Sequence, residues 1–579
     1  MGALLNRRYM GGGGDVDYSK QYLTFEALEN GTFKHNTDVL EYSIDGGATW
    51  VALAANTDSP TVTTGNTIMW RGTMSPGNKN QWFVSTGSFN ASGNPLSLKY
   101  KDNFIGAAVG SYYFYRMFQD CTKLVNAKNV ALPNNVYNTN NVCARMFQGC
   151  TSLISAPTLP TIIGLGAFSN MFNGCTSLTA LPDLPIITTA LSNCYSYMFA
   201  NCSALTTAKD LILSATTLST SCYESMFQGC TSLETPPTIL PATTLANKCY
   251  YYMFYGCASL KSTPVTAPTT LDAQCCQRMF SNCPKLETIN LTLPATTLVD
   301  RCYFAMFAGT KITAAPELPA TTLVSNCYGS MFSGCASLSY IKAMFVTTPS
   351  NDYTNSWVYG VASNGIFIKN SAATWDVRGV YGIPNNWTVE TALPYDAEIE
   401  FIQSDGTQWI DTGITTDSGI LMEYYGAMAG NKSSPIVGVW EAASERFGIY
   451  KYNAYNISAW KNSTSKYIRV SPKDNTFYNV SFDTRGTSFI VKWNGEVKEN
   501  STTSGTFSST SSIKVFYDDY GSSVAPGKIR TLKLTDSNGD VVFDAKAVRV
   551  GQVGYMYDSI TGTLHGNDGE DNFIIGSDL

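Results

Sequence analysis

The segment Cys222-Tyr-Glu-Ser-Met-Phe-Gln-Gly-Cys-Thr-Ser-Leu233 is one copy of a unit that recurs along the middle of this chain of 579 residues. The Met-Phe dipeptide of the unit begins at nine places that lie 25 to 29 residues apart: 117, 146, 171, 198, 226, 253, 279, 306 and 331. A repeat of this length cannot bury its apolar face alone, so successive copies stack on one another. The sequence therefore predicts a solenoid of about nine coils over residues 106–346.

Within a unit, the first Cys and the Met are four residues apart, as are Cys249 and Met253. This spacing predicts a short helix that buries both side chains on one face. Two residues after each Phe stands Gly, Asn or Asp, for example Gly256, and these residues tolerate the left-handed backbone that ends a helix. The phrases Cys-x-x-Leu and Pro-Ala-Thr-Thr-Leu predict extended segments. We therefore expect each coil to hold two extended pieces and a short helix.

All 16 cysteines lie between Cys121 and Cys335, and most occupy two recurring positions of the unit. Stacked coils rise by about 4.8 Å, a separation that a ladder of disulfides could bridge. Inward-facing free thiols would instead act as small apolar groups, and we favour this interpretation. A zinc site needs clustered pairs of cysteines that this spacing does not supply. We accordingly expect no metal and no cofactor.

Composition narrows the classes of function. The chain has 38 Lys+Arg, 44 Asp+Glu and a net charge of -6, which argues against a nucleic-acid partner. Its two histidines, His35 and His565, leave little from which to build a catalytic triad or an acid/base pair. No stretch approaches the ~18 apolar residues of a membrane span, and the start lacks the apolar run of a secretory signal. We expect a protein that is not an enzyme, has no membrane span and is made in the cytoplasm.

The head of the chain, residues 1–19, reads as a short peptide followed by a glycine linker. We expect this peptide to anchor the protein in a larger assembly through Leu4, Leu5, Arg7, Arg8 and Tyr9. The alternative is an unstructured tail.

The remaining flanks predict β structure. Strand patterns between turns indicate a β-sandwich over residues 20–105 and a second, jelly-roll β-sandwich over residues 392–579. Three tryptophans in residues 347–391 indicate a cap over the open end of the solenoid. The fold class is therefore mainly β with short helices.

The pattern Phe-x-x-Cys-x-x-Leu at this period resembles the leucine-rich repeats of the BspA and Treponema type. The longer phrase Cys-Tyr-x-x-Met-Phe-x-Gly-Cys-Thr-Ser-Leu resembles a variant found in proteins of gut Bacteroidales and their phages. Residues 400–413 and 550–558 resemble the opening and closing strands of laminin-G or concanavalin-like domains. These resemblances imply a leucine-rich-repeat protein of the phage tail-fibre kind, with a jelly roll at its end whose family binds many kinds of ligand or none.

Comparison of the copies with one another shows that two positions before Met and one after Phe vary freely, and we expect these side chains to face outward. Among them Tyr251, Tyr252 and Tyr255 could stack on a sugar ring, although a solvated Tyr-rich face is the simpler interpretation. In the last domain, a second candidate for glycan binding consists of Trp440, Tyr450 and Tyr452, part of which should fill the core.

Two acidic stretches, 536–540 and 567–571, could hold calcium through clustered oxygens. Each also makes an ordinary turn, and we favour the turn.

The function that we expect is that of a virion adhesin, a tail-fibre or tail-tip protein that contacts other virion proteins through its N-terminus. Its outer partner would be a host surface polysaccharide or an outer-membrane protein, and a homotrimer would suit a fibre. The alternatives are a bacterial cell-surface adhesin, a capsid fibre and, less well supported, a glycan-degrading enzyme. The carboxylate pair of a glycosidase, in a Glu-x-Asp-x-x-Glu pattern, is not found in the C-terminal sequence.

Overall fold

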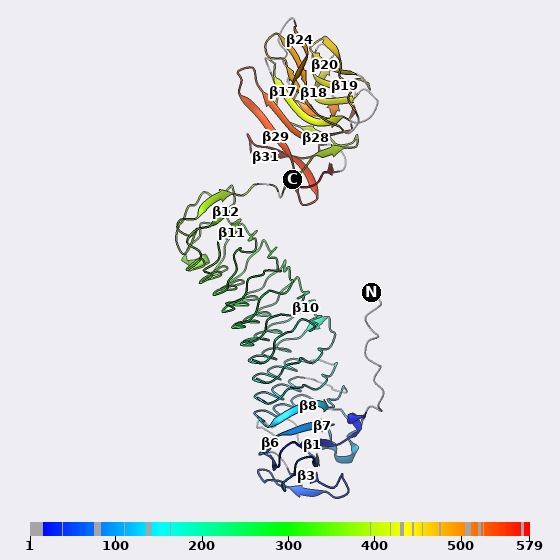
Figure 1. Cartoon of the computed structure of the whole chain (residues 1–579), viewed down its shortest axis with the longest axis vertical. Coiled ribbons are helices and arrows are strands. Elements are labelled where there is room, and N and C mark those ends of the chain that lie inside the picture. Colours follow the sequence, from blue (N-terminus) through cyan, green and yellow to red (C-terminus); the bar gives the residue numbers. More distant parts are fainter. Residues whose placement is uncertain are drawn as a thin grey trace. The chain divides into compact units, whose positions relative to one another are not determined.

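A computed structural model describes residues 16–36, 39–74, 83–108, 110–134, 140–161, 164–393, 395, 397–416, 419–428, 434–442, 445–453, 456–473, 476–503, 511–518, 523–524, 526–568 and 572–579. The chain forms two compact units, Met1–Ala392 and Leu393–Leu579. The first unit contains a β-solenoid of about eight turns, whose stacked coils are visible in Figure 1. The fold is mainly β, as the sequence predicts.

The N-terminal region is β-rich and continuous with the solenoid. Its six-stranded sheet has the order β4-β3-β5-β1-β7-β8, and β2 pairs with β6. The strands are β1 (Leu23–Ala27), β2 (Phe33–His35), β3 (Leu40–Ser43), β4 (Val51–Leu53), β5 (Thr67–Gly72), β6 (Phe83–Ser85), β7 (Phe89–Gly93) and β8 (Leu124–Val130). The short helices are η1 (Tyr18–Lys20), α1 (Ser97–Tyr100) and η2 (Lys101–Asn103). Because β8 belongs to the first coil and pairs in parallel with β7, the sheet and the solenoid share one core.

The prediction of a short helix in each coil is wrong. Over residues 193–201, alternate N–H groups close turns within the coil, as from Met198 to the carbonyl of Tyr195, 3.1 Å away. The intervening N–H groups bond to the next coil, as from Phe199 to the carbonyl of Met226, 2.9 Å away. A residue with positive φ recurs every fourth position, as at Tyr197 (φ 55°), and an α-helix cannot contain it. The segment is a chain of turns with a period of four.

This period still buries the predicted side chains. Residues four apart point the same way, so the first Cys, the Met and the second Cys of a unit share the interior. The positive φ two residues after Phe is confirmed at Gly149, Gly174, Gly229, Gly256, Gly309, Gly334, Asp120, Asn201 and Asn282.

The Phe of each unit stacks on the Phe of the next through the whole solenoid. Centroid separations along the nine rings, from Phe118 to Phe332, are 5.4 to 6.0 Å and the interplanar angles are 2 to 21°. At one end Phe118 packs on Phe83 of the N-terminal region, and at the other Phe332 packs on Trp357. One aromatic ladder therefore links the N-terminal region to the last coil.

The cysteines are free thiols, and all sixteen are buried. This confirms the interpretation as packed thiols rather than disulfides. In seven units the second Cys donates its S–H to a Phe carbonyl in the preceding coil, as Cys175 does to Phe147 over 3.1 Å. Burial raises the pKa of these thiols. The pKa of Cys230, for example, is raised to about 12.

The end of the solenoid is closed by a three-stranded parallel sheet, β11 (Tyr340–Ala343), β12 (Ile366–Lys369) and β13 (Thr388–Thr391). Shorter elements of this unit are β9 (Thr189–Ala190), β10 (Thr217–Leu218) and α2 (Asn351–Thr354). Trp357, Trp375 and Trp387 are buried there, and each indole N–H donates to a backbone carbonyl.

The C-terminal unit consists of two large sheets compatible with a β-sandwich. The eleven-stranded sheet runs β24-β23-β22-β17-β28-β29-β30-β31, with β14, β15 and β32 beside it, and the six-stranded sheet runs β16-β25-β18-β19-β20-β21. The strands of the larger sheet are β14 (Ala397–Glu398), β15 (Ile402–Ser404), β17 (Leu421–Met428), β22 (Phe477–Asp483), β23 (Ser488–Trp493), β24 (Glu496–Thr502), β28 (Gly527–Thr535), β29 (Val541–Val550), β30 (Val553–Asp558), β31 (Thr563–His565) and β32 (Ile574–Ile575). The others are β16 (Ile410–Asp411), β18 (Ser434–Ala442), β19 (Glu445–Lys451), β20 (Asn456–Lys461), β21 (Thr464–Arg469), β25 (Lys514–Val515) and the pair β26 (Tyr517–Asp518) and β27 (Ser523–Val524).

The two sheets share one apolar core. Phe447 of β19 and Phe482 of β22 stack between them, with centroids 5.5 Å apart and planes 3° apart.

Candidate functional site

The structure brings Tyr251, Tyr252 and Tyr255 together on one face of the solenoid. The ring centroids of Tyr251 and Tyr252 are 4.4 Å apart, and those of Tyr252 and Tyr255 are 4.9 Å apart. The chain of turns makes this possible, because Tyr252 has a left-handed backbone (φ 55°) and its neighbour does not. We call these three residues the tyrosine cluster.

Polar groups from the same coil and from the next coil border the tyrosine cluster. The guanidinium of Arg278 lies 5.6 Å from the ring centroid of Tyr252, and the ammonium of Lys248 lies 5.6 Å from that of Tyr251. The amide of Asn282 donates a hydrogen bond of 2.9 Å to the hydroxyl of Tyr255. Partial burial raises the pKa of Tyr251 from its ordinary value near 10 to about 12. The cluster offers ring faces, cations and hydrogen-bonding groups on a rigid support.

The expectation that every variable side chain faces outward is wrong in part. Ser196, Ser225 and Ala305 occupy variable positions but are buried. Neighbouring coils also pack closely at a variable position. A Cβ added at Gly329, for example, would lie 2.8 Å from the ring of Phe304 in the preceding coil.

The second aromatic candidate is only partly described. Trp440 lies on β18, and its side chain is outside the described part of the structure. Tyr450 is half-buried on β19, whereas Tyr452 is 43% exposed and packs on Tyr467 of β21 with centroids 4.6 Å apart. The anchoring candidates Leu4, Leu5, Arg7, Arg8 and Tyr9 all lie outside the described residues.

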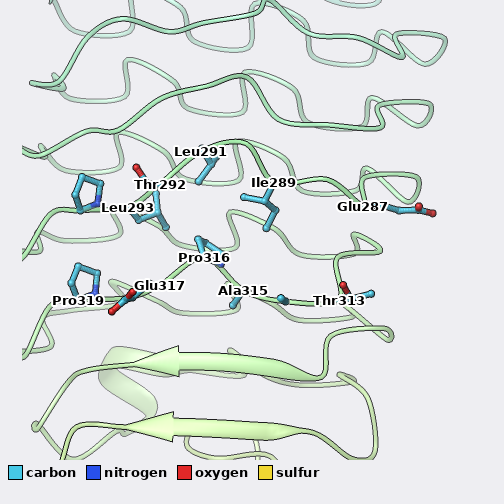
Figure 2. A pocket seen from close by; sticks show the side chains of 12 residues that line it. Glu287, Ile289, Leu291, Thr292, Leu293, Thr313, Ala315, Pro316, Glu317 and Pro319 are labelled. Carbon is cyan, nitrogen blue, oxygen red and sulfur yellow. The ribbon is translucent and has the colours of Figure 1, made fainter. Parts of the chain in front are cut away.

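A slot of about 620 Å³ opens between two coils near the end of the solenoid, and sequence reasoning missed it. Figure 2 shows the segment 287–293 arching away from the segment 313–319. Cys283 and Pro294 are 11 residues apart in sequence, whereas Thr310 and Pro319, at the same places in the next coil, are 9 apart. The longer coil therefore bulges over the shorter one, and the coil lengths were the signal that could have predicted the slot.

The slot is lined mainly by aliphatic side chains and prolines, including Leu291, Leu293 and Pro316. The acidic groups at its ends are already paired: Glu287 with Lys311 at 2.5 Å and Glu317 with Lys342 at 2.9 Å. A groove with this lining can accept apolar groups but offers little to fix their orientation.

Neither acidic stretch behaves as a separate ion site in the residues that are described. The carboxylate of Asp536 accepts the backbone N–H groups of Asn538 and Asp540, each at 2.9 Å, which is an ordinary turn. Asn567 and Asp568 accept N–H groups of residues 409 and 411, and 569–571 lie outside the description. Across the described ranges, no three His, Cys, Asp or Glu side chains are grouped to hold a metal. Among the same residues, no helix is long and apolar enough to cross a membrane.

Residues 114–261 and 224–355 match the family model of the BspA type leucine rich repeat region, in six copies. No curated protein matches the chain in sequence.

Solved structures with partial likeness include a "putative carbohydrate binding protein" from Bacteroides ovatus ATCC 8483, at 12% identity and a TM-score of 0.24, covering 34% of this chain and 67% of that one. A native heptameric SAP-like pentraxin from Limulus polyphemus is similar at 13% identity and a TM-score of 0.22, covering 31% of this chain and 94% of that one.

Proposed function

We propose that this chain, whose residues 114–355 match the family model of the BspA type leucine rich repeat region, is a non-enzymatic adhesin that holds a binding face on a rigid solenoid. The observation that carries the proposal is the tyrosine cluster with Arg278 beside it. Aromatic ring faces bordered by fixed hydrogen-bonding groups are suited to sugar rings, which are apolar on their faces and polar at their edges.

The interior of the solenoid supports a scaffolding role. Stacked Phe rings and buried thiols fill it from the first coil to the last. Its sixteen cysteines are buried, and reactive cysteines need access to solvent. A stiff array of this kind fixes the spacing of side chains on its surface, which favours recognition by many weak contacts.

The finer proposal is that the adhesin belongs to a phage virion, as a tail-fibre or tail-tip protein. In this proposal residues 1–19 join it to other virion proteins, and the solenoid and C-terminal unit meet a polysaccharide or protein of the host surface. The receptor-bearing host would be a gut Bacteroidales bacterium, as the repeat phrase suggests.

The adhesin proposal and the virion proposal are tested by separate measurements. Binding of the fluorescently labelled full chain to Bacteroidales cells tests the adhesin, and a strain panel without any binding would refute it. Mass spectrometry of purified phage particles tests the virion placement. Recovery of the chain from outer membranes of uninfected cells, and not from particles, would instead assign it to the bacterial surface. Release of sugars from capsular polysaccharide by the full chain would show that it is an enzyme.

A further inference from the structure

A cleft of about 480 Å³ lies on the solvent face of the larger C-terminal sheet. Five neighbouring strands form its floor, in the order β23-β22-β17-β28-β29. One row of paired residues crosses all five: Lys492, Ser481, Glu423, Lys533 and Asp544. Four steps between strands make this row roughly 19 Å long.

The alternation of the strands explains why these side chains line the cleft. Their sequence neighbours Tyr424, Val480 and Leu532 are buried in the core between the sheets. Because successive side chains of a strand point to opposite faces, the residues of the row point to solvent.

A second row adds an aromatic ring. Tyr425 on β17 pairs with Asn479 on β22 and with Thr531 on β28, and all three line the cleft. The ring of Tyr425 packs on Phe477, with centroids 5.3 Å apart, so its position is supported from one side.

The cleft is lined by two positively and two negatively charged side chains of the described residues that form no ion pairs with one another. Lys492 and Lys533 stand against Glu423 and Asp544, so the lining has no net charge. In the part of the chain that is described, none of the four lies within 4.0 Å of an opposite charge, the limit for an ion pair. A balanced cleft has no long-range attraction for a polyanion. Its alternating donors and acceptors can instead bind hydroxyl groups, each of which donates and accepts.

We propose that this cleft binds an oligosaccharide of neutral sugars that lies across the strands, with one sugar ring against Tyr425. The inference rests on the proposed adhesin function and deepens it by naming the ligand class and a site in the C-terminal unit. The row alternates donors and acceptors at a step close to that between successive sugar rings of an extended glycan. Sequence reasoning missed this site because its residues come from strands spread over more than a hundred positions.

The test is binding of the full chain to a glycan array of neutral and acidic oligosaccharides, followed by titration calorimetry with the best neutral glycan. We expect a neutral ligand, and we expect Tyr425→Ala and Glu423→Gln each to weaken its binding at least tenfold. Glu423 is exposed, so its substitution should leave the fold intact. The matched control is Tyr467→Ala, a 57% exposed tyrosine on the other sheet, which should bind as the unaltered chain does.

Three results would overturn the proposal: no neutral glycan bound, acidic glycans bound alone, or equal binding by Tyr425→Ala and the unaltered chain. Loss of binding in Tyr467→Ala instead of Tyr425→Ala would move the site to the other sheet. Failure here is distinguishable from failure of the adhesin proposal, because the same variants are tested on Bacteroidales cells. Undiminished cell binding by Tyr425→Ala would leave an adhesin whose site lies elsewhere.

Discussion

The Sγ of Cys230 donates a hydrogen bond of 3.0 Å to the carbonyl oxygen of Phe199, one coil earlier in the solenoid. The same bond recurs from the second Cys of six other units: Cys150, Cys175, Cys202, Cys257, Cys283 and Cys335. A thiol is small enough for the crowded interior, and it supplies a donor between coils. This role explains an abundance of cysteine without disulfides or metal.

Substitution of a ladder thiol should destabilise the solenoid by a modest amount. Cys230→Ala removes the sulfur and its weak hydrogen bond, and we expect a loss of about 1–2 kcal/mol in the free energy of unfolding. Cys230→Ser should lose less, because a hydroxyl keeps a donor at this position; Thr310 fills it in another coil, where its hydroxyl donates to the carbonyl of Phe307 in the same coil. Urea denaturation followed by circular dichroism measures both. The exposed Thr231→Ala is the control, and equal losses in all three variants would contradict the ladder.

The thiols should also make stability fall with rising pH. A thiol in an unfolded chain titrates near pH 8.5. Burial raises the pKa of Cys222 and of Cys230 to about 12, so the folded state keeps these protons where the unfolded state releases them. Their contribution to stability is complete below pH ~8.5 and is lost progressively as the pH rises toward 12.

Hydrogen exchange at pH 7.5 and 9.5, corrected for the intrinsic rate, measures this effect peptide by peptide. Protection should fall in the solenoid and change less in the C-terminal unit, which has no cysteine. Rapid alkylation of the native thiols at pH 7.5 would contradict their burial, whereas all 16 should react after denaturation.

Substitution of glycines that have a left-handed backbone should reduce stability by amounts that depend on the space around each glycine. Gly256 (φ 72°) has open space where a Cβ would be added, whereas a Cβ at Gly229 (φ 72°) would lie 2.5 Å from the side-chain oxygen of Asn201. Gly256→Ala should therefore cost about 1–2 kcal/mol from backbone strain alone, and Gly229→Ala should cost more. Thermal denaturation ranks the two variants, and a reversed order would contradict the chain of turns.

The tyrosine cluster makes a prediction about binding. Tyr252→Leu removes the central ring between Tyr251 and Tyr255, and we expect at least tenfold weaker binding to cells if sugar rings stack there. Tyr359→Leu, in a 62% exposed position of the cap region, is the matched control. Flow cytometry of labelled variants measures the difference. Equal binding by both variants would assign recognition to another surface.

The repeat period predicted the solenoid, its buried thiols and the positive φ two residues after each Phe, because each depends on residues close in sequence. The helix prediction failed for a physical reason. Cys194, Met198 and Cys202 recur every four residues, and this period suits either a helix or a chain of four-residue turns. The two structures differ in the positive φ of residues such as Asn193 and Tyr197. Hydrogen bonds from these residues to the next coil stabilise that backbone conformation.

Features that depend on distant residues could not be predicted in this way. The slot between residues 287–293 and 313–319 arises where a longer coil lies beside a shorter one. The cleft in the C-terminal unit likewise requires the pairing of β17 with β22 and β28. Such pairing is set by the whole core and not by local pattern.

The measurement that tests the account most directly is binding of the labelled full chain to Bacteroidales cells before and after periodate oxidation of their surface sugars. An adhesin that reads glycans through aromatic and polar side chains should bind the untreated cells, and oxidation should abolish at least nine-tenths of that binding. Full binding after oxidation, or no binding to any untreated strain, would contradict it.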